Sequence, residues 1–238
     1  MNGASVTHAG HHRVAVLAAI AVGSVLLWQT EIGSLVLYPF TILATWFHEM
    51  GHGLAAMLVG SDFDHLVIHA DGSGYAVSSR PSDAYRLTSA FIAAAGPMGP
   101  AIAGSLLIVA SRHERNARHA LTVLGVALLV STVIWIRSLV GWVAMPAIGL
   151  VILGIARIGR PGVLKLTTQV LGVQAGISAW RSFDYLFSAA GSVGGAAQRS
   201  DTSAIADAML LPYWFWGAGI SAAIVALMVW SVARALRR

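Results

Sequence analysis

The chain has 238 residues, of which 57% are apolar and only 11% are charged, and its mean hydropathy is +0.73. Soluble domains carry roughly 25% charged residues, so this composition excludes an ordinary soluble globule, and it is too apolar for a disordered chain. The formal net charge is +5 and there is no Cys. Any metal site must therefore use His and carboxylate side chains. These values predict an integral membrane protein with helical spans.

Six apolar runs are candidates for spanning helices, which need about 20 apolar residues each. They cover residues 14–28, 32–59, 87–111, 120–136, 139–156 and 208–233. A further segment, 164–190, is only moderately apolar, and it is either an interfacial amphipathic helix or a span with an inward polar side. The expected fold is an all-α polytopic membrane protein of about six to seven apolar helices. Residues 1–238 are expected to form a single membrane-embedded domain, with a polar tail over 1–13 and an uncleaved anchor helix after it.

The basic residues lie at the ends of these runs, which indicates contact with the headgroups of a lipid bilayer and not with nucleic acid. Arg13 precedes the first run, whereas Arg112, Arg115 and Arg118 follow the third. If every run crossed the membrane once, the two groups would lie on opposite sides, against the tendency of Lys and Arg to gather on one side. Either one run does not cross fully, or the orientation is inverted.

Two segments between the runs are polar. Residues 60–86 hold two short alternating stretches, His65–His69 and Tyr75–Ser79, around the turn sequence Asp71–Gly74, and this pattern predicts a β-hairpin. Residues 191–207 are rich in Gly, Ala and Ser and predict a flexible loop.

The second run contains an HExxH motif made of His48, Glu49 and His52. On a helix, residues four apart share a face, so both imidazoles can bind one Zn²⁺ ion, and Glu49 on the flank can act as the base that deprotonates a water. Ionisable residues inside an apolar run are costly and indicate function. The alternative is a polar kink or hydrogen bonding between helices.

A catalytic zinc normally has a third protein ligand. Asp184 is the best candidate, since it is flanked closely by aromatic residues on both sides, although it can instead pair with Arg181 three residues earlier. Asp201 is typical of an N-cap or a loop residue, and Asp207 of the first turn of the last helix, and both stay open as alternative ligands.

Residues 93–100, with the sequence AAAGPMGP, place two Gly and two Pro in an apolar helix. They allow close helix packing, or they open the helix beside the metal so that Gly96, Pro97 and Gly99 meet the substrate.

The HEMGH helix, the Gly-rich hairpin after it and the AAAGPMGP motif together resemble the site-2 protease family of intramembrane zinc metalloproteases, in particular its compact bacterial branch without a PDZ domain. The resemblance covers residues 35–110 well and 170–216 loosely. It implies that His48 and His52 are zinc ligands, that Glu49 is the base, and that an Asp on a later helix, best matched by Asp184, is the third ligand. The chain departs from the family pattern at two positions: Tyr185 follows Asp184 where a Gly is usual, and Gly99-Pro100 replaces an Asn.

The expected function is therefore hydrolysis of peptide bonds in or near transmembrane segments of a membrane-protein substrate, in a bacterial cell membrane. We expect an extended substrate to pair with the strand that begins at Tyr75. The alternative is a zinc-binding membrane protein without protease activity, either a transporter or a scaffold that binds helices. Against it, the polar groups are concentrated in one helix plus Asp184, and structural zinc has no need of Glu49.

Overall fold

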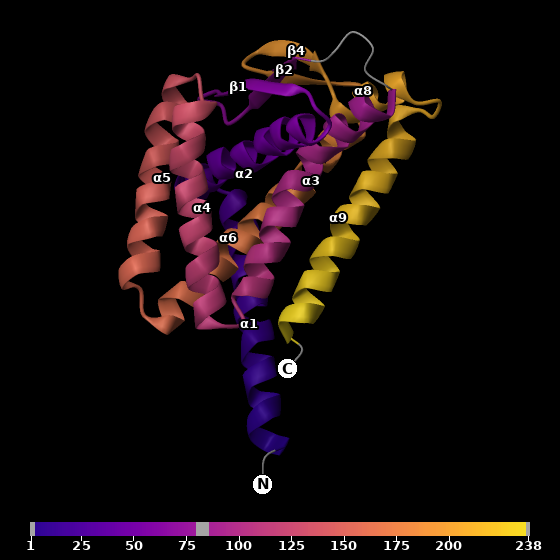
Figure 1. Ribbon diagram of the computed structural model, residues 1–238. Helices are drawn as coiled ribbons and strands as arrows, with labels where there is room; N and C mark the ends of the chain where they lie inside the picture. The colour runs from indigo at the N-terminus through magenta and orange to yellow at the C-terminus, as the bar shows by residue number, and fades with distance from the viewer. Residues whose placement is uncertain (1–2, 80–85, 237–238) are drawn as a thin grey trace.

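The computed structural model describes residues 3–79 and 86–236, with side chains described from Val14 onward. Residues 1 and 2 of the predicted tail and residues 80–85 of the predicted hairpin loop lie outside these ranges. The described elements, shown in Figure 1, are α1 (Gly3–Trp28), α2 (Glu31–Leu58), β1 (Asp62–Ile68), β2 (Gly74–Ser79), α3 (Arg86–Ala110), α4 (Glu114–Ile134), α5 (Leu139–Ile158), α6 (Pro161–Arg181), α7 (Phe183–Leu186), β3 (Ala190–Val193), β4 (Ala196–Arg199), α8 (Asp201–Ala208) and α9 (Tyr213–Leu236).

The expected polytopic helical fold is confirmed. In the described residues, four helices are long and apolar enough to cross a membrane, namely α3, α4, α5 and α9, and the bent pair of α1 and α2 makes a fifth if it counts as one span. The remaining long helix, α6, carries the polar residues that make the segment 164–190 only moderately apolar. One of them, Gln174, is buried and donates from Nε2 to Ser24 Oγ of α1 at 3.0 Å, so a polar side of α6 faces the protein interior.

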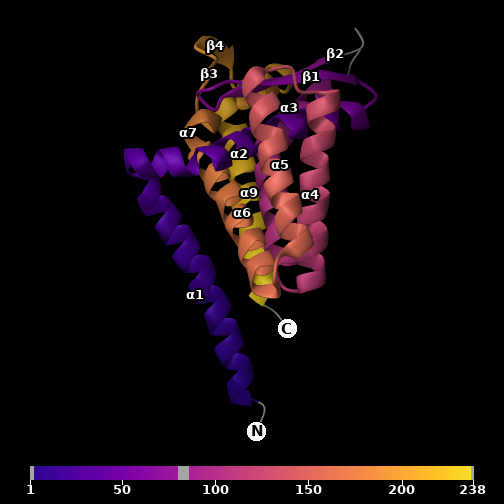
Figure 2. The ribbon, with the colours of Figure 1, turned by 90° about the vertical axis from the view of Figure 1, so that its left-hand side faces the viewer.

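The break between α1 and α2 changes the path of the chain. The two helices meet at 117°, and Thr30 caps the start of α2 by accepting a hydrogen bond from the Gly33 N–H at 3.0 Å. Figure 2 shows α1 descending away from the bundle while α2 lies across its upper end. Because α1 and α2 do not cross as two separate spans, the start of α1 and the α3–α4 connection lie at the same end of the molecule. The conflict between Arg13 and the later Arg cluster is thereby removed.

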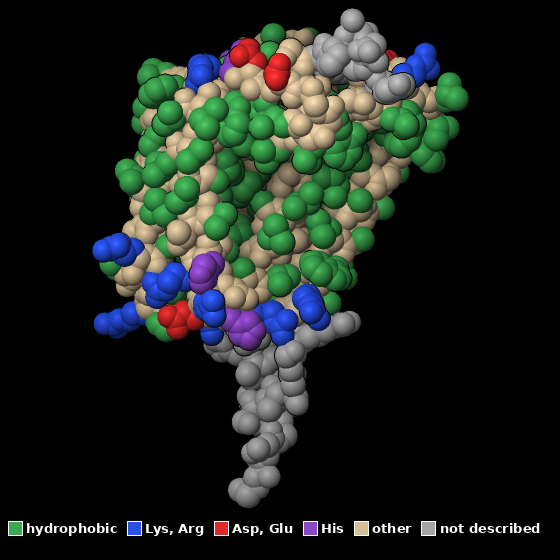
Figure 3. Space-filling model, viewed as in Figure 1, with side chains coloured by type: hydrophobic (Ala, Val, Ile, Leu, Met, Phe, Trp, Pro, Cys, Tyr) green, Lys and Arg blue, Asp and Glu red, His purple; other side chains and the backbone are tan. Residues whose placement is uncertain are grey.

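Lys and Arg side chains gather at the end opposite the hairpins, below a broad apolar band (Figure 3). The α3–α4 and α5–α6 connections lie at this end (Figure 1), and they or their flanking turns carry Arg112, Arg115, Arg118, Arg157 and Arg160. Arg118 also donates to the carbonyls of Ala156, Arg157 and Gly159, and so caps the end of α5.

Two apolar clusters hold the helices together. One joins α2, β1, α3, α4, α5 and α6 around fully buried residues such as Ile42, Leu121 and Met145. Trp46 of α2 adds a buried hydrogen bond to Ser131 of α4 at 2.9 Å. The other joins α3, α6, α7, α8 and α9 around residues such as Leu186 and Ile205. Because α2 and α3 pack against each other, the two clusters meet at the helix that carries the HExxH motif.

The predicted first hairpin is confirmed, with β1 and β2 paired antiparallel. The outer edge of β1 is already occupied, because Leu66 donates to the Trp135 carbonyl at 2.9 Å and accepts from the Arg137 N–H at 3.0 Å. Within the described residues β2 pairs with β1 alone, so its outer edge is the one that faces the pocket described below.

The segment predicted as a flexible loop over 191–207 is instead a second hairpin followed by a short helix. Gly194 and Gly195 both have positive φ, +56° and +80°, which suits the two-residue turn that joins β3 to β4. Ser200 then caps α8 by accepting from the Ser203 N–H at 3.2 Å. Asp207 lies on α8 and not at the start of the last helix, because α9 begins only after Pro212.

Candidate metal centre

Helix α2 places His48 and His52 one turn apart on one face, with their Nε2 atoms 3.1 Å from each other. Nδ1 of His52 lies 2.7 Å from the Ile92 carbonyl oxygen of α3. A carbonyl can only accept, so Nδ1 carries a proton, and in the neutral imidazole Nε2 then has the lone pair that a metal ion needs. This arrangement, a backbone carbonyl orienting a histidine from behind, is typical of metal-binding histidines.

The third group is Asp201, the first residue of α8. Its Oδ2 lies 3.0 Å from His48 Nε2 and its Oδ1 lies 3.2 Å from His52 Nε2, and the three side chains are the one group in the described part of the chain that could hold a metal ion. The Asp201 side chain is only 13% exposed, and its two carboxylate oxygens face the Nε2 atoms of the two histidines. A cation held among the carboxylate and the two imidazoles satisfies these atoms, so the donor set fits a His₂Asp metal site.

Asp184, the predicted third ligand, is not among the residues that the structure brings together. It is exposed on α7, while its neighbour Tyr185 faces the pocket, since successive residues on a helix point about 100° apart. Asp207 does not join the site either, because it pairs with Arg199 on the surface. The structure therefore replaces Asp184 with Asp201 as the partner of the two histidines.

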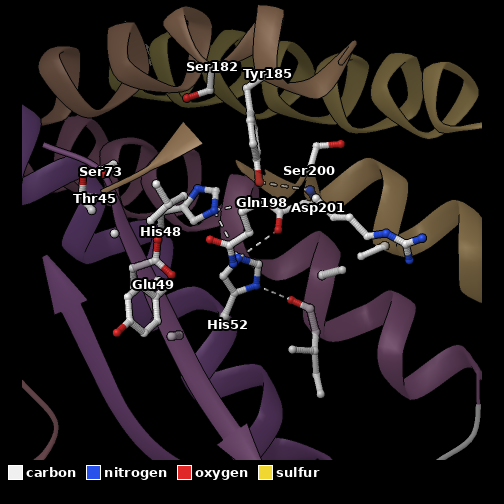
Figure 4. A pocket seen from close by; sticks show the side chains of 18 of the residues that line it. Thr45, His48, Glu49, His52, Ser73, Ser182, Tyr185, Gln198, Ser200 and Asp201 are labelled. Carbon is white, nitrogen blue, oxygen red and sulfur yellow. Dashed lines mark hydrogen bonds and ion pairs between the residues drawn. The ribbon is translucent and has the colours of Figure 1, made fainter. Parts of the chain in front are cut away.

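Glu49 lies beside this group. Its side chain is 5% exposed, it lines the same pocket as the histidines, and it accepts a hydrogen bond from the backbone of Ala76 on β2. Figure 4 shows Glu49 next to His48 and His52, with Asp201 approaching the histidines from the other side. A buried carboxylate in this position can exchange a proton with a water held at the site.

The AAAGPMGP motif serves close packing between α3 and α2. A Cβ on Gly96 would overlap the Nε2 atoms of His48 and His52, and one on Gly99 would overlap the Phe47 carbonyl oxygen. Pro97 is buried. Of this motif Ala93 and Pro100 line the pocket, whereas the three residues predicted to bind substrate, Gly96, Pro97 and Gly99, do not.

Gly96→Ala is expected to weaken metal binding by more than about tenfold, because the added methyl displaces both imidazoles. The measurement is metal affinity by competition with a coloured chelator. Gly154→Ala is the matched control, since a Cβ at this helical glycine of α5 meets nothing within 4 Å. Equal affinity in the two variants would contradict the close approach of α3 to the histidines.

The pocket has a volume of about 430 Å³ and lies between α2, α3, β2 and the β3–β4 hairpin. Tyr75, predicted to bind substrate, lines it from β2. The two hairpins meet over it, where the Gly194 N–H donates to Ser73 Oγ at 2.9 Å. Much of the remaining lining is hydroxyl-bearing, including Ser78, Ser178, Ser182 and Ser192. The pocket is thus a polar cavity at the hairpin end of an apolar bundle.

Comparison with known proteins supports this assignment. A family model described as Peptidase M50B-like matches residues 16–232, which is most of the chain. No curated protein and no solved structure matches the chain. The match includes both motif histidines, Glu49 and Asp201. The chain therefore belongs to the Peptidase M50B-like family, within the site-2 protease family of membrane metallopeptidases.

Proposed function

We propose that the protein is an intramembrane zinc endopeptidase that hydrolyses peptide bonds in or near transmembrane segments of membrane-protein substrates. The observation that carries the proposal is the convergence of His48, His52 and Asp201 on one point, with Glu49 buried in the same pocket. We also propose a bacterial cell membrane as its location, on the resemblance to the compact bacterial branch.

His48, His52 and Asp201 would hold the zinc ion, which would supply Lewis-acid activation of a water and of the substrate carbonyl. Glu49 takes one proton from the attacking water and passes it to the nitrogen of the leaving amine, so that the C–N bond breaks and a carboxylic acid and an amine are formed. The acid then gives its proton to the amine, and the products leave as a carboxylate and an ammonium group. His52 is oriented by the Ile92 carbonyl throughout. A zinc transporter or a helix-binding scaffold has no comparable need for a buried carboxylate beside the three ligands.

The substrate must reach the site in extended form, because the carbonyls of a helix are hydrogen-bonded within it. The outer edge of β2 has no partner strand among the described residues, although the Ala76 backbone donates to Glu49, and Gly74, Tyr75 and Ala76 line the pocket. We propose that the substrate adds as a strand along β2, beside Tyr75. Gly96 and Gly99 then contribute by letting α3 lie close to α2, not by direct contact with substrate.

Removal of the metal tests this function. The full chain in phosphatidylcholine vesicles with a transmembrane peptide is expected to cleave the peptide, to lose cleavage on treatment with a zinc chelator, and to regain it when Zn²⁺ but not Mg²⁺ is added, because hard oxygen-preferring Mg²⁺ suits this donor set poorly. The products are identified by mass spectrometry. Cleavage that persists after elemental analysis shows the zinc to be gone would refute a zinc endopeptidase.

A further inference from the structure

Tyr185 stands in the wall of the pocket opposite the HExxH helix. Figure 4 shows it reaching from α7 toward Asp201, with its hydroxyl at the metal group. The ring is held from two sides: its neighbour Leu186 is fully buried in the core, and a Cβ on Gly191 of β3 would overlap the ring itself. The hydroxyl is therefore placed by the fold and not by a mobile surface side chain.

The Tyr185 hydroxyl accepts one hydrogen bond and can still donate another. The Asp201 backbone N–H donates to Tyr185 Oη at 3.1 Å, so the oxygen already accepts. The hydroxyl can rotate about its C–O bond to donate its proton, and its acceptor in the described chain is the Asp201 carboxylate. A metal ion competes for that carboxylate, so Tyr185 can direct its proton to a substrate oxygen instead.

Four other hydroxyls of the pocket donate to acceptors outside the metal group. Several donate to backbone carbonyls close to them in the fold, at 2.5–3.0 Å: Thr45 to Gly72, Ser182 to Ser178, and Ser200 to Ser188. Ser73 donates to the Asp71 carboxylate at 2.6 Å. Tyr185 differs from these in that its hydroxyl adjoins a group of the metal site itself.

We propose that Tyr185 is a catalytic residue that donates a hydrogen bond to the carbonyl oxygen of the substrate as negative charge develops on it. This inference rests on the proposed function. The step moves no proton from Tyr185: water adds to the carbonyl carbon, the electron pair of the C=O bond moves to oxygen, and the phenol stabilises that charge. The role was not visible in the sequence, where Tyr185 appeared only as the residue that follows Asp184.

Tyr185→Phe tests the proposal, because it removes the hydroxyl and keeps the ring that packs against Gly191. The expected loss is about 10²–10³-fold in kcat, the usual effect of removing one donor to a developing oxyanion, with KM changed by less than about threefold. The variant should also bind a phosphinic peptide, whose tetrahedral group carries the corresponding charged oxygen, more weakly by a similar factor. Tyr213→Phe at the start of α9, away from the pocket, is the matched control and should leave both values unchanged.

Zinc affinity, measured by chelator competition, separates this role from a structural one. It should be unchanged in Tyr185→Phe, and a fall in zinc affinity that accounts for the lost activity would overturn the proposal in favour of a residue that holds Asp201. Wild-type kcat in Tyr185→Phe would overturn the proposal while leaving the zinc endopeptidase standing. Absence of zinc-dependent cleavage by the wild-type protein would overturn both.

Discussion

Glu49→Gln is expected to reduce the rate of peptide cleavage by about 10²–10⁴-fold, the range that a positioned general base contributes, while the protein keeps its metal. The amide matches the carboxylate in size, so the packing of a side chain that is only 5% exposed is retained, and its oxygen can still accept from Ala76. It cannot take a proton from water, however. The rate is measured from the products of a transmembrane peptide, and bound zinc by elemental analysis of the same sample.

The matched control is Glu31→Gln, which makes the same change in the exposed first turn of the same helix. It should cleave at the wild-type rate. Equal rates for Glu49→Gln and the wild type would remove Glu49 from the mechanism. Loss of metal from Glu49→Gln would show instead that this carboxylate supports the metal site.

Asp201→Asn is expected to lower metal affinity by more than about 100-fold, whereas Asp184→Asn keeps the wild-type affinity. Removing an outer partner of a metal ligand already costs about 10–100-fold, and here the change replaces a charged ligand with a neutral amide. Asp184 is exposed and lies outside the metal group, so its charge has no comparable role. Affinity is measured by chelator competition, and cleavage should fall together with it.

These two variants form a pair that decides the ligand set. Retention of metal by Asp201→Asn together with its loss in Asp184→Asn would restore the ligand that the sequence favoured. Arg199→Ala is a further control, since it removes an exposed side chain that pairs with Asp207 and is not a member of the metal group. It should leave metal affinity within about twofold, in line with the small effect of exposed ion pairs.

The parts of the molecule that depend on short stretches of chain were predictable. His48 and His52 share a face because of their spacing alone, and the alternation and Gly-rich turn of residues 65–79 specify a hairpin. The long apolar runs became helices, although α1 begins at Gly3, inside the predicted polar tail, and α4 begins at Glu114, six residues before the expected start. Each of these features is decided by residues within a few turns of one another, so no knowledge of packing was needed.

The third metal group depends on packing and could not be derived in the same way. Asp184 stood out because aromatic residues flank it, but those aromatics place Tyr185 in the pocket and leave Asp184 exposed. Two local signals did point to Asp201: the Gly194–Gly195 pair as a hairpin turn, and Ser200 as a cap that puts Asp201 in the first turn of a helix. Neither signal shows that this turn lies against α2, because that contact follows from α3, α8 and α9 packing together.

The role of the AAAGPMGP motif could also be predicted only in part. Its composition predicted either close packing or an open helix, and only the contact with the histidines distinguishes the two. The glycines act on the metal site through the absence of side chains, which a pattern of residue types does not reveal.

The position of Asp201 also has a consequence for how the protein holds its shape. About 150 residues of chain separate it from the histidines, and it lies at the start of an eight-residue helix outside the candidate spans. An ion bound at the site therefore acts as a cross-link that ties the segment from β3 to α8 onto α2. At an ion concentration 100 times the Kd, such binding adds about 2.7 kcal/mol to the stability of the closed arrangement. Metal binding and the attachment of the segment from β3 to α8 to the rest of the protein are thus thermodynamically linked.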